Sequence, residues 1–229
     1  MKFLCTALLI TFAAASPIVL PESEAMELQA RQLGSTRTEL ESGSSSACPK
    51  AILIFARGST ETGNLLTQGT LGVPLGNALE SRYGAANIWV QGVGGPYGAT
   101  LGDNFLPRGS SAAAIGEGVR LLNLANSKCP NSKVVTGGYS QGSALIAAAL
   151  SDATATVRNQ AVGTVLFGYT QNLQNRGGVP NYPSDRLDVF CAVGDLVCSG
   201  TLTITAAHLS YGDEAADEAP EFLISKIGA

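Results

Sequence analysis

The stretch KVVTGGYSQGSALIAAAL, residues 133–150, joins a strand-like run to a helix-forming run through a serine between glycines. Residues 133–136 hold three β-branched residues, Val134, Val135 and Thr136, and residues 141–150 are rich in Ala and Leu, which favour helix. Between them, GYSQG at 138–142 fits the pattern Gly-x-Ser-x-Gly, with Ser140 at its centre. A serine on such a turn projects from a strand end onto a helix N-terminus, where free N–H groups favour an oxyanion. The stretch therefore predicts an α/β fold that carries a nucleophilic serine.

The alternation of strand and helix continues on both sides of this stretch. Apolar runs that are nearly continuous, as in strands buried on both faces, lie at residues 50–57, 87–93, 133–136, 162–167 and 187–193. Segments that suit helices lie between or after them, at residues 71–81, 111–127, 141–150 and 219–227. Strands separated by helices of this size form βαβ units around a mostly parallel sheet. We expect an α/β domain of three layers, and the alternative is an α+β arrangement.

The composition limits the classes of protein that this chain can belong to. It has 229 residues, of which 45% are hydrophobic and 14% charged, enough apolar content for one packed domain. The net charge of −4 argues against a nucleic-acid binder, which normally presents a basic face. A single histidine, His208, rules out most zinc sites, which need several His or Cys ligands. We expect a monomer that needs no metal, no cofactor and no nucleic-acid partner.

The N-terminal residues have the pattern of a secretion signal. Lys2 precedes an uncharged apolar run from Phe3 to Ala15, which ends in the small residues that a signal peptidase prefers. We expect a signal peptide over 1–16, a pro-segment over 17–31, and a single catalytic domain over 32–229. Residues 32–47 are polar and Ser-rich and are expected to form a loose leader, with the ordered core at about 48–229. No later run reaches the ~18 apolar residues of a membrane span, so secretion is expected.

Four cysteines remain once Cys5 is removed with the signal peptide. An even number in an oxidising compartment suggests two disulfides, and four cysteines allow three pairings. The close spacing of Cys191 and Cys198 favours a small loop between them, which leaves Cys48 to pair with Cys129. The long bridge would mainly stabilise the fold, whereas the short one would shape a local site.

A serine nucleophile needs a base, and His208 is the only histidine in the chain. A histidine is more often an ordinary core or surface residue, but without it Ser140 would depend on rarer Lys or carboxylate activation. The carboxylate that orients the base should follow a later strand. Asp195 fits, because it comes after 187–193 and lies between Cys191 and Cys198. Other aspartates fit better as caps or solvated charges, namely Asp152, Asp185 and Asp188.

Four segments occur in order along the chain: ARGSTETG at 56–63, GDN at 102–104, GGYSQG at 137–142, and GDLVC at 194–198. Through these segments the chain resembles the fungal cutinases, from about Cys48 to the C-terminus. The junction ARQLG at 30–34 also resembles the family's processing site. The resemblance implies a five-stranded parallel sheet flanked by helices. It also implies the pairs Cys48–Cys129 and Cys191–Cys198, the pairing that loop size favours.

The same resemblance assigns roles to the residues of the site. It implies Ser140 as nucleophile, His208 as base and Asp195 as the carboxylate that orients the base. It further implies an oxyanion hole formed by the backbone N–H groups of Ser59 and Gln141, with Asn104 holding the Ser59 hydroxyl. Ser59 follows the first predicted strand, so its N–H should emerge at the same sheet edge as Ser140. An ordinary strand-exit turn is the alternative for Ser59.

Apolar residues around the predicted site indicate the class of substrate. They lie on two loops: Leu101, Phe105 and Leu106 on one, and Leu202, Ile204 and Leu209 beside His208 on the other. Together they would form an exposed apolar rim that binds a polyester such as cutin or a lipid-like ester, although each could belong to a local core instead. No insertion long enough for a helical lid interrupts these loops, so we expect an open groove. The alternatives are an acetylxylan esterase, a lipase-like carboxylesterase, or a non-catalytic wall-binding or effector protein.

Overall fold

The computed structural model describes residues 36–65 and 71–229 of the chain. The expected signal peptide (1–16) and pro-segment (17–31) lie outside the described residues. Within the described part, no helix is both long enough and apolar enough to cross a membrane.

Five parallel strands form one sheet in the order β2-β1-β3-β4-β5. Their bounds are β1 Ala51–Ala56, β2 Ile88–Gly92, β3 Lys133–Tyr139, β4 Ala161–Phe167 and β5 Leu187–Phe190. The predicted strands are thereby confirmed, with two differences in length. β3 runs on through its glycines to Tyr139, because Gly137 and Gly138 pair in register with both β1 and β4. β5 stops at Phe190, three residues earlier than expected, and the loop that follows carries Asp195.

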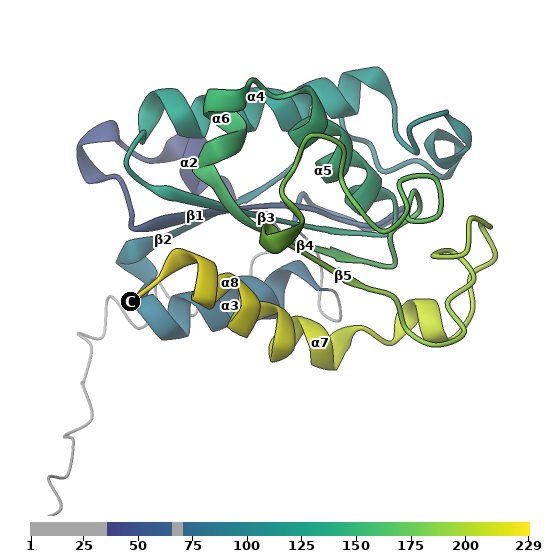
Figure 1. Cartoon of the computed structure of the whole chain (residues 1–229). Helices are drawn as coiled ribbons and strands as arrows, with labels where there is room; N and C mark the ends of the chain where they lie inside the picture. The colour runs from purple at the N-terminus through teal and green to yellow at the C-terminus, as the bar shows by residue number, and fades with distance from the viewer. Residues whose placement is uncertain (1–35, 66–70) are drawn as a thin grey trace, which may run out of the picture.

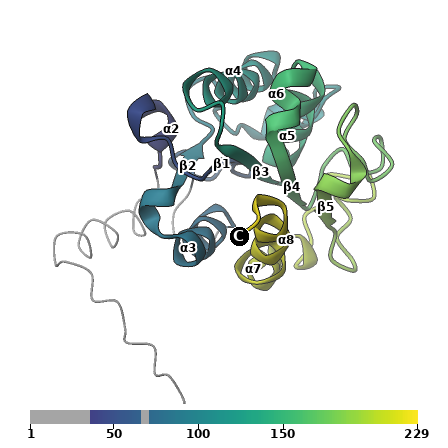
Figure 2. The ribbon, with the colours of Figure 1, turned by 60° about the vertical axis from the view of Figure 1, so that its left-hand side comes forward.

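Helices cover both faces of the sheet, which confirms the three-layer α/β fold (Figures 1 and 2). One face carries α4 (Ala112–Lys128), α5 (Gln141–Asp152) and α6 (Ala155–Gln160), and the other carries α3 (Gly72–Tyr83), α7 (Gly212–Ala216) and α8 (Glu218–Ile227). Short helices complete the described chain: α2 Glu39–Ser42, η1 Ser45–Ala47, η2 Ala85–Asn87, η3 Leu101–Phe105, η4 Ser184–Arg186 and η5 Ala207–Leu209.

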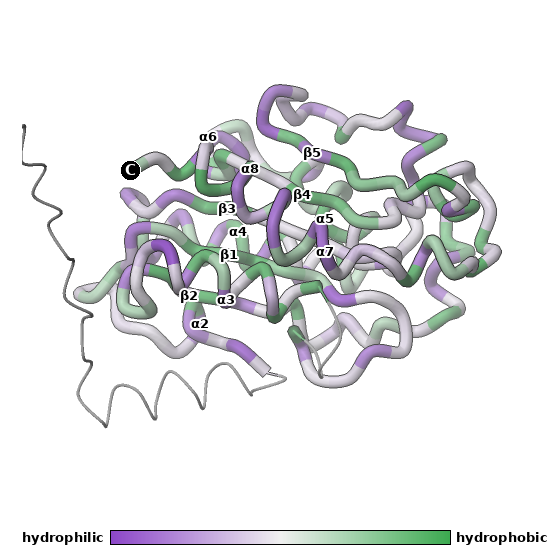
Figure 3. The backbone as a smooth tube through the Cα atoms, turned by 90° about the horizontal axis from the view of Figure 1, so that it is seen from below, coloured by the Kyte–Doolittle hydropathy of each residue, from purple (hydrophilic) through white to green (hydrophobic). Residues whose placement is uncertain are grey.

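The central strand β1 shows why the predicted strands are continuously apolar. Ile52 and Ile54 belong to the hydrophobic core beneath α4 and α5, whereas Leu53 and Phe55 belong to the core beneath α3, α7 and α8. Successive side chains point to opposite faces of a strand, and here both faces are covered. Figure 3 shows the same result as a hydrophobic centre formed by the strands.

The expectation of a loose leader is wrong for residues 36–47. The backbone N–H of Arg37 donates to Asn64 Oδ1 at 2.8 Å, and its guanidinium donates to the buried Glu80 at 2.5 Å. Leu40 on α2 is fully buried in the core. Leu40 and the buried Arg37–Glu80 ion pair therefore hold residues 36–47 against the domain, although the polar composition of this segment indicates a solvated leader.

The four cysteines pair as Cys48–Cys129 and Cys191–Cys198. The first bridge ties the residues before β1 to the C-terminal end of α4, and the second closes the loop after β5. This second loop, together with the segment around η5, forms part of the site described next.

Candidate active site

Ser140 stands on a sharp turn between β3 and α5. Its backbone has φ 54° and ψ −118°, a conformation that costs energy for a residue with a side chain. Two contacts hold the turn: the Ser140 N–H donates to the Phe167 carbonyl at 2.9 Å, and the helix packs tightly on β1. A Cβ at Gly142 would lie 2.0 Å from the Ala56 carbonyl oxygen, so only glycine permits that approach. The strained turn presents the Ser140 hydroxyl at the carboxyl end of β3, as a nucleophile on such a turn requires.

The structure brings Ser140, His208 and Asp195 together in one chain of contacts. His208 Nε2 lies 3.0 Å from Ser140 Oγ, and His208 Nδ1 lies 2.9 Å from Asp195 Oδ2. The three residues are only 7%, 1% and 4% exposed, in the order Ser140, His208, Asp195. With the proton on Nδ1 held by the carboxylate, Nε2 is free to accept the hydroxyl proton. The arrangement can generate a serine nucleophile.

Asp195 is fixed by more than its contact with the histidine. Its Oδ1 accepts the Val197 N–H at 2.9 Å, and its Oδ2 accepts the Tyr211 O–H at 2.5 Å. The Cys191–Cys198 bridge closes the loop on which it stands. Tyr211 was not singled out from the sequence, because a tyrosine three residues after a histidine carries no recognisable motif.

His208 sits in η5 between aromatic rings and backbone. Its imidazole stacks on Tyr139, with centroids 5.3 Å apart and planes 27° apart, and the Tyr139 O–H donates to the His208 carbonyl at 2.9 Å. On another side lies Gly168, whose φ is +53° and where a Cβ would lie 2.6 Å from His208 Cε1. The imidazole of His208 can therefore occupy this position only because residue 168 is a glycine. Sequence reasoning missed both Tyr139 and Gly168.

The residues expected at the oxyanion hole are linked to one loop, residues 100–104. Asn104 Nδ2 donates to Ser59 Oγ at 2.9 Å and to the Leu101 carbonyl at 3.1 Å. The Gln141 side chain donates to the Thr100 carbonyl at 2.6 Å. Gln141 is also the first residue of α5, and N–H groups in the first turn of a helix have no acceptor within it. The same loop thus braces both Ser59 and Gln141.

Glu61 is an ionisable group of this region that the sequence did not single out. Its Oε2 accepts the Gly58 N–H at 2.5 Å, and its backbone carbonyl accepts from Arg57 Nε at 2.7 Å. Burial raises the pKa of Glu61 to about 7, while the Gly58 N–H and the Arg57 charge act in the opposite direction. Glu61 thereby ties together the ends of the turn that carries Ser59.

A cavity of about 350 Å³ opens beside Ser140 and His208. Five of the six predicted rim residues line it: Leu101, Phe105, Leu202, Ile204 and Leu209. They stay well exposed, with Phe105 at 79% and Leu209 at 69%. Leu106, the residue after η3, is exposed but does not line the cavity. The lining also includes Thr60, Tyr139, Thr170 and Val197, which sequence reasoning missed.

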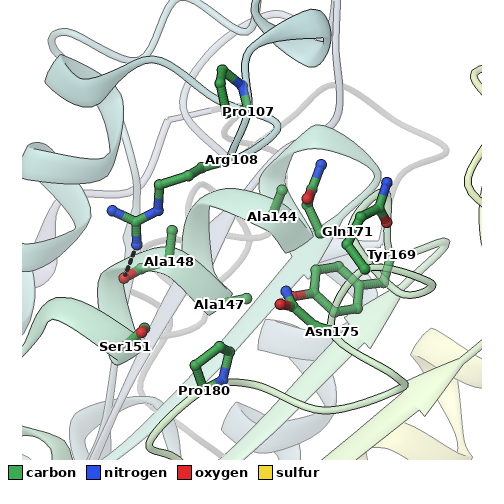
Figure 4. Close-up of a pocket in the computed structure, with 11 residues that line it drawn as sticks. Pro107, Arg108, Ala144, Ala147, Ala148, Ser151, Tyr169, Gln171, Asn175 and Pro180 are labelled. Atoms are coloured by element: carbon green, nitrogen blue, oxygen red, sulfur yellow. Dashed lines mark hydrogen bonds between the residues drawn. The ribbon is translucent and has the colours of Figure 1, made fainter.

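A second cavity, of about 260 Å³, is lined by Ala144, Ala147, Ala148 and Ser151 of α5 and by none of Ser140, His208 and Asp195 (Figure 4). Arg108 lies at its edge, and its guanidinium donates to both carboxylate oxygens of Asp152, at 2.7 and 3.0 Å. It also donates to the Ala148 carbonyl (Figure 4). The main charge of this cavity is therefore already paired. Among residues 36–65 and 71–229, no cluster of three His, Cys, Asp or Glu side chains is arranged to hold a metal ion.

Known proteins resemble this chain over its whole length. Residues 47–227 match the family model described as Cutinase. The chain is 58% identical over 230 residues to a cutinase of Didymella rabiei, with 100% of both chains covered. It is 56% identical over 231 residues to a cutinase of Fusarium solani subsp. cucurbitae, covering 100% of this chain and 98% of that one.

Solved structures agree with the fold. Trichoderma reesei cutinase in complex with a phosphonate inhibitor matches with a TM-score of 0.69 at 27% identity, covering 91% of this chain and 87% of that one. An acetylxylan esterase matches with a TM-score of 0.61 at 21% identity, covering 79% and 100%. The second likeness concerns the fold alone.

Proposed function

The chain belongs to the cutinase family of carboxylic ester hydrolases, and from this premise we propose that it hydrolyses cutin and similar aliphatic polyesters through an acyl-enzyme on Ser140. One observation carries the proposal. Ser140 contacts His208 at 3.0 Å and His208 contacts Asp195 at 2.9 Å, and both Ser140 and His208 line an apolar cleft. Family membership supplies the reaction class, and the geometry supports the residue that performs each step.

In acylation, His208 Nε2 takes the hydroxyl proton as Ser140 Oγ forms a bond to the ester carbonyl carbon. The carbonyl oxygen becomes an oxyanion, and the N–H groups of Ser59 and Gln141 are the donors that would stabilise it. When the intermediate collapses, the bond from carbon to the alcohol oxygen breaks. His208 gives its proton to the leaving alcohol, and the acyl group stays on Ser140.

Deacylation repeats the sequence with water. His208 Nε2 takes a proton from water, whose oxygen attacks the acyl carbon, and the same two N–H groups hold the oxyanion. The bond to Ser140 Oγ breaks, the serine recovers its proton from His208, and a carboxylic acid leaves. Asp195 remains ionised throughout and stabilises the imidazolium in both halves of the cycle.

The cleft supports a substrate with long aliphatic parts. The apolar side chains of Leu101, Phe105 and Leu209 stand exposed around the nucleophile, and exposed apolar surface of this kind favours contact with an apolar solid. An acetyl ester would leave most of these contacts unused, so an acetylxylan esterase activity fits the cleft less well. The enzyme's place would be outside the cell, where cutin is found, in agreement with the expected signal peptide.

The experiment is an acyl-length series of p-nitrophenyl esters together with solid cutin, with Ser140→Ala as the control. We expect turnover of butyrate and longer esters to exceed that of acetate, and release of hydroxy fatty acids from cutin. Ser140→Ala should lower kcat by about 10⁴-fold or more while its circular dichroism stays unchanged. Activity confined to acetyl esters would contradict the substrate class, and activity retained by Ser140→Ala would contradict the mechanism.

A further inference from the structure

Tyr211 makes two hydrogen bonds at the centre of the site. It follows His208 by three residues, at the start of α7, and its side chain is buried. The phenol O–H donates to Asp195 Oδ2 at 2.5 Å, and the phenol oxygen accepts the Ala192 N–H at 3.0 Å. The hydroxyl thus joins the segment of the base to the loop of the carboxylate. A phenylalanine would fill the same space and make neither bond.

The partners of the Asp195 carboxylate show what this hydroxyl does electrostatically. Oδ1 accepts only the Val197 N–H among the contacts described, whereas Oδ2 accepts both His208 Nδ1–H and the Tyr211 O–H. Two donors therefore share the oxygen that faces the imidazole. A hydrogen bond to a carboxylate oxygen partly neutralises the negative charge of that oxygen. The Tyr211 O–H therefore weakens the electrostatic attraction between Asp195 Oδ2 and the imidazole of His208.

We propose that Tyr211 is a positioning residue that acts through Asp195, by holding the carboxylate against His208 and by moderating its charge. The inference rests on the proposed function, because it assumes that His208 is the base. The hydroxyl fixes the direction from which Oδ2 meets the imidazole, which keeps Nε2 aimed at Ser140 Oγ. By sharing Oδ2, it also limits how strongly the carboxylate favours the imidazolium.

The surroundings of Tyr211 suit this task. Its ring packs against His208, Tyr139 and Phe167, with centroids at 6.4, 6.4 and 6.1 Å, so the phenol has little freedom to turn. Burial and the Asp195 carboxylate both raise the pKa of Tyr211, so the hydroxyl keeps its proton and remains a donor. The other titratable groups near the pair are Tyr139 and, beyond it, Glu61, whose charge also acts on Tyr139.

The test compares Tyr211→Phe with Tyr182→Phe. Tyr182 is a matched control, because its buried hydroxyl donates to the Ala161 carbonyl at 3.0 Å and does not line the catalytic cleft. Since His208 is the only histidine, the imidazole signals in an NMR titration belong to it alone.

For Tyr211→Phe we expect the midpoint of this titration to rise by about 0.5–1 pH unit. We also expect kcat to fall about tenfold with KM within about twofold, because positioning and not docking is disturbed. Tyr182→Phe should leave the midpoint, kcat and KM unchanged.

A measurement on the unmodified protein complements the variants. Two protons that share Asp195 Oδ2 lie close together, so a slowly exchanging Tyr211 phenol proton should show a nuclear Overhauser effect to the His208 Nδ1 proton. Absence of this signal would overturn the proposal, as would a midpoint in Tyr211→Phe that is unchanged or lower than in the wild type. The proposed function fails separately, if the wild type hydrolyses no ester or if Ser140→Ala keeps its activity.

Discussion

Glu61 is a single residue whose burial has a consequence that can be measured as a function of pH. Its pKa is raised from 4.5 to about 7, chiefly because burial penalises the charged form. Between these two pH values the unfolded chain releases the proton while the folded protein retains it. Stability therefore falls as pH rises from about 4.5 to about 7, and the loss is complete above that range.

Replacing Glu61 by Gln should remove this loss and keep an oxygen to accept the Gly58 N–H. Below pH 4.5 the variant and the wild type should be about equally stable, and above pH 7 the variant should be more stable. The gain should be about 1–2 kcal/mol after allowance for partial solvent screening. Urea unfolding at pH 4.5, 6 and 8 measures it. Glu218→Gln, at an exposed position on α8, is the control and should gain no stability over the wild type at any of these pH values. A Glu61→Gln variant that loses stability as pH rises would contradict this assignment.

The residues of the site divide into those that a motif reveals and those that only packing reveals. Ser140, His208 and Asp195 could be predicted, because Gly-x-Ser-x-Gly is a local pattern, the histidine is unique and the aspartate follows a strand. Gly168 and Tyr211 could not, because their roles depend on contacts with His208 and Asp195 that arise only when distant loops meet. Leu106 was included because its neighbours Leu101 and Phe105 lie on the same loop, but it does not line the cleft.

At the scale of elements, the two disulfides should have different effects because they close different loops. The Cys191–Cys198 bridge, with a separation of seven residues, encloses Asp195, whereas the Cys48–Cys129 bridge, with a separation of 81, ties the start of β1 to α4. Loop entropy makes the short bridge worth roughly 2.5 kcal/mol and the long one roughly 4.5 kcal/mol.

We expect Cys191→Ser with Cys198→Ser to lower kcat more than it raises KM, because the loop that holds Asp195 is loosened. Cys48→Ser with Cys129→Ser should lower the melting temperature further and leave turnover near normal in molecules that fold. Calorimetry and steady-state kinetics on the two double variants provide the comparison. Equal losses of kcat in both, or a loss confined to the long bridge, would show that the short loop does not position Asp195.

The elements themselves were largely predictable because both faces of the sheet are covered. Continuous apolar runs such as 50–57 stand out when every strand residue is buried. The C-terminal part of β3 was missed because glycines disfavour strands in general, whereas Gly137 and Gly138 are held there by pairing with β1 and β4. The docking of residues 36–47 was missed because it depends on Leu40 and on the Arg37–Glu80 pair, contacts between segments far apart in the sequence.

At the scale of the whole molecule, the cleft opens to solvent between the loop of η3 and the loop before η5. Its rim residues stay exposed although they are apolar, and none of the described residues that line the cleft belongs to an α-helix, as a helical lid would require. We therefore expect hydrolysis to need no lipid interface. The rate with tributyrin should rise smoothly with concentration below its solubility limit, without a jump at that limit. A sharp activation at the limit would mean that a segment closes over Ser140 in solution.

The proposed mechanism requires Ser140 to be the nucleophile, with His208 as its base and Asp195 holding the base. Reaction of the purified protein with a p-nitrophenyl phosphonate, followed by peptide mass mapping, tests this directly. We predict one phosphonyl group per molecule, on the peptide that contains Ser140, with loss of activity in proportion to labelling. The His208→Asn variant should be labelled much more slowly than the wild type, because it lacks the base. Labelling of another serine, or full activity in the labelled protein, would contradict the account.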